Sequence, residues 1–296
     1  MPTAKAVYHR LVREYPALGA VRMNRLVFGN IRPLHINLRF WRYLRHCQKV
    51  TDSLRTPATP EVRAAANELR TKGFIVFPPR GNRNVVDSLN VKISELMRAG
   101  RYTVGIGEED WFWHIPDVMN TLPEIIALIR PDIAATIEEY FGAYFKIFSA
   151  EMYRIVPSQK TPDASGLWHT DNYPPGMVKI MVYLTACDEK TGALKVHPWS
   201  TTRRLLRRGF FNRANTAPYH DLLESDWVPI EGPPGTTLLW DSNICHRATP
   251  PTQGIRDAIA FKFIPSVEPW EQHLARVGDG VNYERRPHIP HNPADD

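Results

Sequence analysis

The feature that most constrains the fold is a change in the sequence pattern near residue 144. From there the chain carries short apolar runs separated by turn residues, at 144–156, 178–187, 193–197, 236–240 and 256–264. Runs of this length, rich in β-branched and aromatic residues, are typical of strands. Helical patterns precede them, so the order of elements predicts helices packed on an antiparallel sandwich or barrel. The expected fold class is therefore mainly β with flanking helices.

The part before residue 144 is expected to hold the helices. Thr59 can cap a helix that begins at Pro60 and stops at Gly73. A buried strand is then expected over 74–77, followed by helices over about 85–99 and about 122–141, the second of them broken near Pro131. We expect three parts. Residues 1–56 form a basic N-terminal helical extension, residues 57–265 form a β domain with a helical first part and an insertion at 199–231, and residues 266–296 form a surface tail.

Size and cysteine content narrow the class of protein. With 296 residues, 43% of them apolar, the chain can bury a core without disulfides or metals as staples. Its three cysteines (Cys47, Cys187 and Cys245) are irregularly spaced, which argues against a disulfide framework and a Cys-based zinc cluster. The sequence holds no apolar run of transmembrane length and no signal-peptide pattern, so we expect a cytoplasmic protein.

Positive charge is concentrated in the first fifty residues, which hold ten Lys and Arg but a single acidic residue. Arg39, Arg42 and Arg45 recur on one face of a predicted helix over 35–49, with Trp41 nearby. Such a helix can lie peripherally on an anionic membrane, at its inner face, or can pack its apolar side on the β domain and leave its arginines in water. A nucleic-acid partner is not expected, because few stacking aromatic residues interleave with the basic ones.

The sharpest motif is Trp168-His169-Thr170-Asp171. On a strand His169 and Asp171 would share a face, one pleat apart, a spacing that suits two ligands of one metal. His246 offers a third ligand. Two imidazoles and one carboxylate occupy one face of an octahedron and leave the other open, as in non-haem Fe(II) oxygenases, whose open positions take a co-substrate and O2.

Arg256 stands ten residues beyond His246, at the start of a predicted strand. A guanidinium can hold a carboxylate with two parallel hydrogen bonds, in a geometry that a lysine does not reproduce. An iron centre and a carboxylate clamp are together what 2-oxoglutarate requires, since its keto-acid end chelates the metal and its far carboxylate needs the clamp.

At these residues the chain resembles the phytanoyl-CoA dioxygenase family of Fe(II)/2-oxoglutarate oxygenases. The resemblance covers roughly residues 60–265 and rests on His169-x-Asp171, 178–200, 238–250 and Arg256 with the strand that follows it. It implies a double-stranded β-helix, or jelly roll, with Fe(II), 2-oxoglutarate and O2. The ligands and clamp that it implies are His169, Asp171, His246 and Arg256.

Two further residues are candidates for contact with the co-substrate. Met152 matches a co-substrate-lining position of the family, although a core methionine is the alternative. Thr185 follows the metal pair on the next predicted strand, where its hydroxyl could touch the co-substrate; Lys179 lies on the same strand, and packing roles are equally open for both. The chain departs from the family pattern at Trp199 and Thr201, near the expected substrate contacts.

A carboxylate at Asp171 favours hydroxylation, because a related halogenase would need Gly or Ala there. The insertion holds a cluster of arginines: Arg203, Arg204, Arg207, Arg208 and Arg213. The cluster could recognise a phosphate or carboxylate of the substrate, or it could be the solvated face of a basic helix. The expected substrate is thus a small or lipid-linked anionic metabolite, such as an acyl-CoA, a natural product or the acidic sugar Kdo of a lipopolysaccharide precursor. The alternatives are a catalytically silent jelly-roll binding protein and a zinc hydrolase, the latter disfavoured because no HExxH-type base accompanies the ligands.

Overall fold

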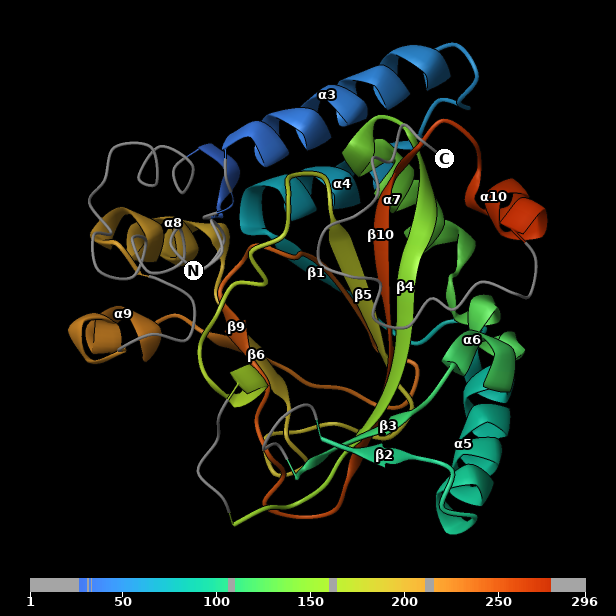
Figure 1. Cartoon of the computed structure of the whole chain (residues 1–296), viewed down its shortest axis with the longest axis vertical. Coiled ribbons are helices and arrows are strands. Elements are labelled where there is room, and N and C mark those ends of the chain that lie inside the picture. The colour runs from blue at the N-terminus through green and yellow to red at the C-terminus, as the bar shows by residue number, and fades with distance from the viewer. Residues whose placement is uncertain are drawn as a thin grey trace, which may run out of the picture.

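The computed structural model describes residues 27–30, 32, 34–105, 110–159, 164–210 and 216–277. Two antiparallel sheets face each other and form the jelly roll, and helices cover the outer surface of the larger sheet (Figure 1). The larger sheet has the strand order β1-β8-β5-β10-β4-β3-β2, and the smaller one has the order β7-β6-β9. The fold class expected from the sequence is confirmed.

The strands of the larger sheet are β1 (Phe74–Phe77), β2 (Thr103–Val104), β3 (Phe112–Ile115), β4 (Tyr144–Ile155), β5 (Val178–Tyr183), β8 (Thr237–Asp241) and β10 (Arg256–Ser266). Those of the smaller sheet are β6 (Leu194–Val196), β7 (Val228–Ile230) and β9 (His246–Arg247). Each of the five strand-like runs predicted after residue 144 overlaps one of these strands. Strand β7 lies within the predicted insertion, and the two-residue β2 and β9 are too short to leave a pattern.

The helices are α3 (Leu34–Thr51), α4 (Pro60–Lys72), α5 (Arg83–Arg98), α6 (Val118–Thr121), α7 (Pro131–Phe141), α8 (Trp199–Arg208), α9 (His220–Leu223) and α10 (Trp270–Val277). Short 3-10 helices lie at Pro123–Leu128, Ala164–Gly166 and Ala217–Tyr219. The break that the sequence predicts near Pro131 is confirmed: the segment 122–141 forms two elements, because Pro131 lacks the N–H that a continuous helix needs and starts α7 instead.

The larger sheet separates two apolar cores. Its outer face packs against the helices through residues such as Ile259, Phe261 and Phe263 of β10. Its inner face, with Ala258 and Ala260 of the same strand, packs against the smaller sheet. This alternation follows from the two-residue period of a strand and leaves small side chains on the inner face of β10.

Helix α4 shows how the sequence sets the position of an element. Thr59 accepts a hydrogen bond from the Val62 amide at 3.4 Å, and Gly73 ends the helix with a left-handed φ of 91°. A Cβ at Gly73 would lie 2.5 Å from a methyl carbon of Ile244 and 2.8 Å from the Trp199 ring. Glycine is required there because the chain turns into β1 against the segment that leads to His246.

Helix α3 falls within the predicted N-terminal extension and packs on the larger sheet, in contact with β4 and β10. Its buried residues include Tyr43 and Cys47, which belong to the outer core. At the other end of the chain, Trp270 of α10 stacks on Phe145 with ring centroids 6.3 Å apart. Residues 1–26 of the predicted N-terminal extension and residues 278–296 of the predicted tail lie outside the described residues.

Candidate metal centre

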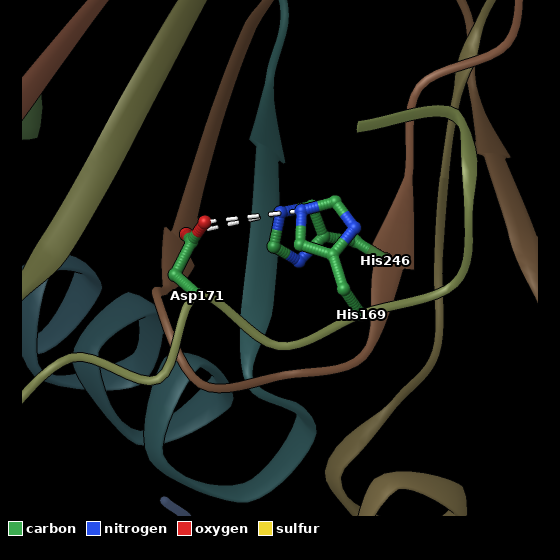
Figure 2. A group of neighbouring side chains, drawn as sticks. All are labelled: His169, Asp171 and His246. Carbon is green, nitrogen blue, oxygen red and sulfur yellow. Dashed lines mark ion pairs between the residues drawn. The ribbon is translucent and has the colours of Figure 1, made fainter. Parts of the chain in front are cut away.

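His169, Asp171 and His246 converge inside the jelly roll, with both rings turned toward the carboxylate (Figure 2). His169 Nε2 lies 3.9 Å from Asp171 Oδ1, and His246 Nε2 lies 3.8 Å from Asp171 Oδ2. Both separations fit within two metal–ligand bonds of about 2 Å each. The three residues that the sequence singled out can therefore hold one metal ion.

Backbone pairing brings the ligands together. His169 and His246 exchange two main-chain hydrogen bonds, of 2.9 and 2.8 Å, and the Asp171 amide donates to the Ser242 carbonyl at 3.1 Å. The expectation that His169 and Asp171 lie on a regular strand is wrong: the segment forms an isolated bridge and then a loop. Asn172 turns the chain immediately after Asp171, with a left-handed φ of 58°, which ends any strand there.

Each imidazole is held in the orientation that a metal needs. Nδ1 of His169 lies 2.7 Å from the Leu167 carbonyl oxygen, and Nδ1 of His246 lies 2.9 Å from that of Ile244. A carbonyl oxygen only accepts, so Nδ1 carries the proton and the lone pair of Nε2 faces Asp171. This donor set, two neutral imidazoles and one carboxylate, fits a non-haem iron.

Lys179 of β5 borders the site, with its Nζ 2.5 Å from Asp171 Oδ2. Burial by itself raises the pKa of the Asp171 carboxyl, but the charges beside it, chiefly that of Lys179, outweigh burial and hold that pKa below its usual value. Asp171 is therefore an ionised ligand at neutral pH.

Arg256 begins β10 and is completely buried. Its Nη1 donates to the Gly192 carbonyl, and its guanidinium lies 5.9 Å from the centroid of the Tyr183 ring. Its Nε has no hydrogen-bond partner among the described residues. A buried N–H of a charged group without an acceptor fits a carboxylate ligand, as the 2-oxoglutarate clamp requires.

The two remaining predicted contact residues lie in different places. Met152 belongs to the outer core, on the face of β4 opposite to that of Tyr153, so the structure places it as a core methionine away from the triad. The Thr185 hydroxyl accepts a hydrogen bond from the Asp257 amide at 3.0 Å, next to Arg256. Its contact with the co-substrate stays a prediction.

Four of the five arginines of the insertion are exposed on α8, and Arg213 lies outside the described residues. Arg208 contacts Asp221 at 2.6 Å, and Arg204 lies 3.9 Å from Asp226. The described arginines thus form a solvated face, partly neutralised by acidic neighbours.

Sequence reasoning singled out Lys179 but missed a second charged pair beside the triad. Lys262 of β10 contacts Glu151 of β4 at 2.7 Å, and both side chains are largely buried. Every second residue of β10 lies on the same face of the sheet, and Arg256, Ala258, Ala260 and Lys262 share the inner one. A lysine at such an inward position could have indicated a buried charged site from the sequence alone.

Comparison with protein families decides between the remaining alternatives. The family model of phytanoyl-CoA dioxygenase (PhyH) matches residues 154–258, a stretch that contains His169, Asp171 and His246. Over this stretch the chain is similar to the phytanoyl-CoA dioxygenase family. No curated protein sequence matches the chain.

Solved structures share the fold of this chain at low sequence identity. The α-ketoglutarate-dependent epimerase SnoN from nogalamycin biosynthesis is 16% identical, with a TM-score of 0.55 over 69% of this chain and 83% of that one. The carbocyclase SnoK from the same biosynthesis is 18% identical, with a TM-score of 0.53 over 78% and 97%. Iron-bound EctD from S. alaskensis is 18% identical, with a TM-score of 0.54 over 79% and 92%. At such identities the likeness shows the jelly-roll fold.

The family match and the triad together identify the chain as an Fe(II)/2-oxoglutarate-dependent oxygenase. Its cofactors are accordingly Fe(II) and 2-oxoglutarate, and the alternatives of a silent jelly-roll protein and a zinc hydrolase do not fit these findings. Among the helices that the structure describes, none is both long and apolar enough to cross a membrane.

Proposed function

We propose that this oxygenase hydroxylates an unactivated C–H bond of a small or lipid-linked anionic metabolite, with release of succinate and CO2. The observation that carries the proposal is the pairing of the triad with Arg256, a buried cation that has a donor to spare. The substrate classes we favour are an acyl-CoA, a natural product and the acidic sugar Kdo of a lipopolysaccharide precursor.

Each residue has a separate task in this proposal. His169, Asp171 and His246 hold Fe(II), and Arg256 holds the far carboxylate of 2-oxoglutarate. When bound, iron and 2-oxoglutarate supply the oxidising power for C–H cleavage through oxidative decarboxylation of the co-substrate. The complete burial of Arg256 excludes water from the clamp and strengthens its bond to a carboxylate. Because Asp171 keeps its carboxylate, no ligand position is freed for a halide, which favours hydroxyl transfer.

The test separates co-substrate binding from turnover. Anaerobic addition of Fe(II) and 2-oxoglutarate should produce the weak visible charge-transfer band of the chelate. Succinate release under O2 should then rise with an anionic candidate, such as an acyl-CoA or a Kdo-containing precursor, above the rate seen with its neutral analogue. Absence of the band would contradict the proposed function. Equal stimulation by the neutral analogues would contradict the proposal that the substrate is anionic.

The exposed face of helix α3 supports a further part of the proposal, that the protein contacts the inner surface of an anionic membrane peripherally. Arg39, Arg42 and Arg45 are exposed along this helix, although the opposite face is buried against the sheet. Trp41 is 45% exposed and Leu38 is 36% exposed between them. Basic side chains interleaved with exposed apolar ones are the surface that anionic headgroups attract.

A further inference from the structure

A row of four hydrogen-bond donors crosses the inner face of the larger sheet beside the triad. Trp240 of β8 lies directly opposite Lys179 of β5, Lys179 lies opposite Lys262 of β10, and Lys262 lies opposite Ser149 of β4. Directly opposed residues of antiparallel strands share a face, so the two lysines are cross-strand neighbours. Two like charges in this position destabilise a sheet, and their presence therefore calls for a functional reason.

Both lysines are largely buried and each is balanced by one carboxylate. The side chains of Lys179 and Lys262 are 12% and 13% exposed. Lys179 pairs with Asp171 at 2.5 Å and Lys262 with Glu151 at 2.7 Å, and both ammonium groups lie within 6 Å of the Tyr173 ring centroid. Burial alone would lower the pKa of Lys262, but Glu151 raises it above its usual value, so this lysine stays charged.

The two outer members of the row are buried polar groups without partners. Trp240 and Ser149 are each 2% exposed. Neither the Trp240 Nε1 nor the Ser149 Oγ has a hydrogen-bond partner among the described residues. A buried donor that the protein itself leaves unsatisfied is a costly feature, and an oxygen-rich ligand would remove that cost.

Loading of the metal centre increases the demand for an anion. Asp171 balances Lys179 in the present structure, but as a metal ligand it shares its charge with a divalent cation. Once Asp171 ligates the metal, Lys179 loses part of the negative charge that faces it, while Lys262 keeps Glu151 as its partner. A buried cation whose partner is weakened is stabilised by a ligand of opposite sign.

We propose that the row Trp240–Lys179–Lys262–Ser149 is the subsite that takes the anionic group of the substrate, a carboxylate or a phosphate. This inference rests on the proposed function and adds to it the residues that recognise the substrate. Arg256 begins the inner face of β10 and Lys262 lies six residues further along it, with Ala258 and Ala260 between them. One strand thus anchors the co-substrate at its start and the substrate at Lys262, and its small residues leave room between the anchors.

The experiment uses protein loaded with Co(II) and N-oxalylglycine, an unreactive analogue of 2-oxoglutarate. Inorganic phosphate and acetate are titrated into it by calorimetry, while the visible spectrum of Co(II) is followed. At least one of the two anions should bind without changing that spectrum. Lys262→Met should weaken this binding about tenfold or more, as expected for the loss of a charge-assisted hydrogen bond.

Lys195→Met is the matched control. Lys195 of β6 is similarly buried, at 14% exposure, and similarly paired, 3.6 Å from Glu189 and over the Trp227 ring, but it lies outside the row. This variant should bind the anion like the wild type. If Lys262→Met is unstable because Glu151 loses its partner, the charge-neutral double variant Glu151→Gln/Lys262→Met removes the pair and should show the same loss.

The possible failures are distinguishable. Protein that does not take up Co(II) and N-oxalylglycine contradicts the proposed function. Loaded protein that binds neither anion, or binds them equally after Lys262→Met, overturns the subsite. An anion that changes the Co(II) spectrum binds the metal instead of the lysine row, which also overturns it. Phosphate binding without acetate binding would identify a phosphorylated substrate, and the reverse result a carboxylate.

Discussion

At the scale of single residues, the triad acts as a set. With His169 or His246 replaced by alanine, the site keeps two protein ligands, which is too few to hold iron against water and buffer. We expect His169→Ala and His246→Ala each to abolish iron binding and succinate production, as measured by metal analysis and product assay. His220→Ala, which removes an exposed histidine of α9, should leave both unchanged. Normal iron content in either triad variant would mean that the ligands are misassigned.

Arg256 is expected to govern affinity for the co-substrate and not for the metal. Loss of one partner of a buried bidentate ion pair costs about 2–5 kcal/mol, which is about 30-fold to several thousandfold in affinity. Arg256→Ala should raise the Kd for 2-oxoglutarate by such a factor while the Kd for Fe(II) stays the same, both measured anaerobically. Arg256→Lys should recover only part of the loss, because an ammonium lacks the planar fork. An unchanged Kd for 2-oxoglutarate would assign the clamp to another residue.

The site was predictable from the sequence where short spacing carries the chemistry. His169 and Asp171 are two residues apart, and Arg256 follows His246 closely, so each motif is visible along the chain. The lysine row was not predictable, because it depends on the register of four strands. The pairing of β10 with β4 also shifts directly after Lys262, where β4 passes from Ser149 to Ile147, and no local pattern predicts this bulge.

At the scale of elements, α3 offers a test of membrane contact. Each Lys or Arg near an anionic surface contributes about 1 kcal/mol, and salt weakens the attraction. The triple variant Arg39→Glu/Arg42→Glu/Arg45→Glu should therefore release the protein from anionic vesicles in a sedimentation assay at low salt. Its binding of Fe(II) and 2-oxoglutarate should not change, since α3 lies on the outer face of the sheet.

A charge-matched control separates α3 from net charge. Arg203→Glu, Arg204→Glu and Arg207→Glu reverse three exposed arginines of α8 and change the total charge equally. This control should remain on the vesicles. Equal release of both triple variants would indicate a general charge effect, and a wild type that ignores anionic vesicles would remove the membrane contact altogether.

Elements with strong local signals agreed with their sequence patterns. Helix α4 carries a cap, a starting proline and a terminal glycine, and it begins and ends where these predict. The strand expected at 169–171 did not form, since Asn172 turns the chain away after a single bridge. The spacing of His169 and Asp171 is too short a pattern to specify a strand, although it was sufficient to indicate two metal ligands.

At the scale of the whole molecule, His197 links stability to pH. It is completely buried, and burial lowers its pKa to about 4 from the ordinary 6.5. Above pH 6.5 both folded and unfolded chains hold it neutral, whereas between 6.5 and 4 only the unfolded chain takes up the proton. This histidine should therefore lower the free energy of unfolding by about 2 kcal/mol between pH 7 and pH 5.

Urea unfolding of the wild type and of His197→Gln at the two pH values measures this effect. The variant should lose about 2 kcal/mol less than the wild type on acidification, whatever its stability at pH 7. Comparison of the two differences cancels the titration of the other histidines. Identical pH dependence in both proteins would show that His197 is not held neutral by burial.

The central position of β10 has a consequence for the biosynthesis of the protein. This strand is the last of the sheet in chain order, but it separates β4 from β5, and its pairing partners lie about a hundred residues earlier. A ribosome therefore releases β4 and β5 with unpaired edges and no strand between them. Contacts of such long sequence separation form slowly, and open edges invite intermolecular pairing. A nascent chain that stalls before Arg256 is thus expected to aggregate, and efficient production should depend on chaperones that hold the chain until β10 emerges.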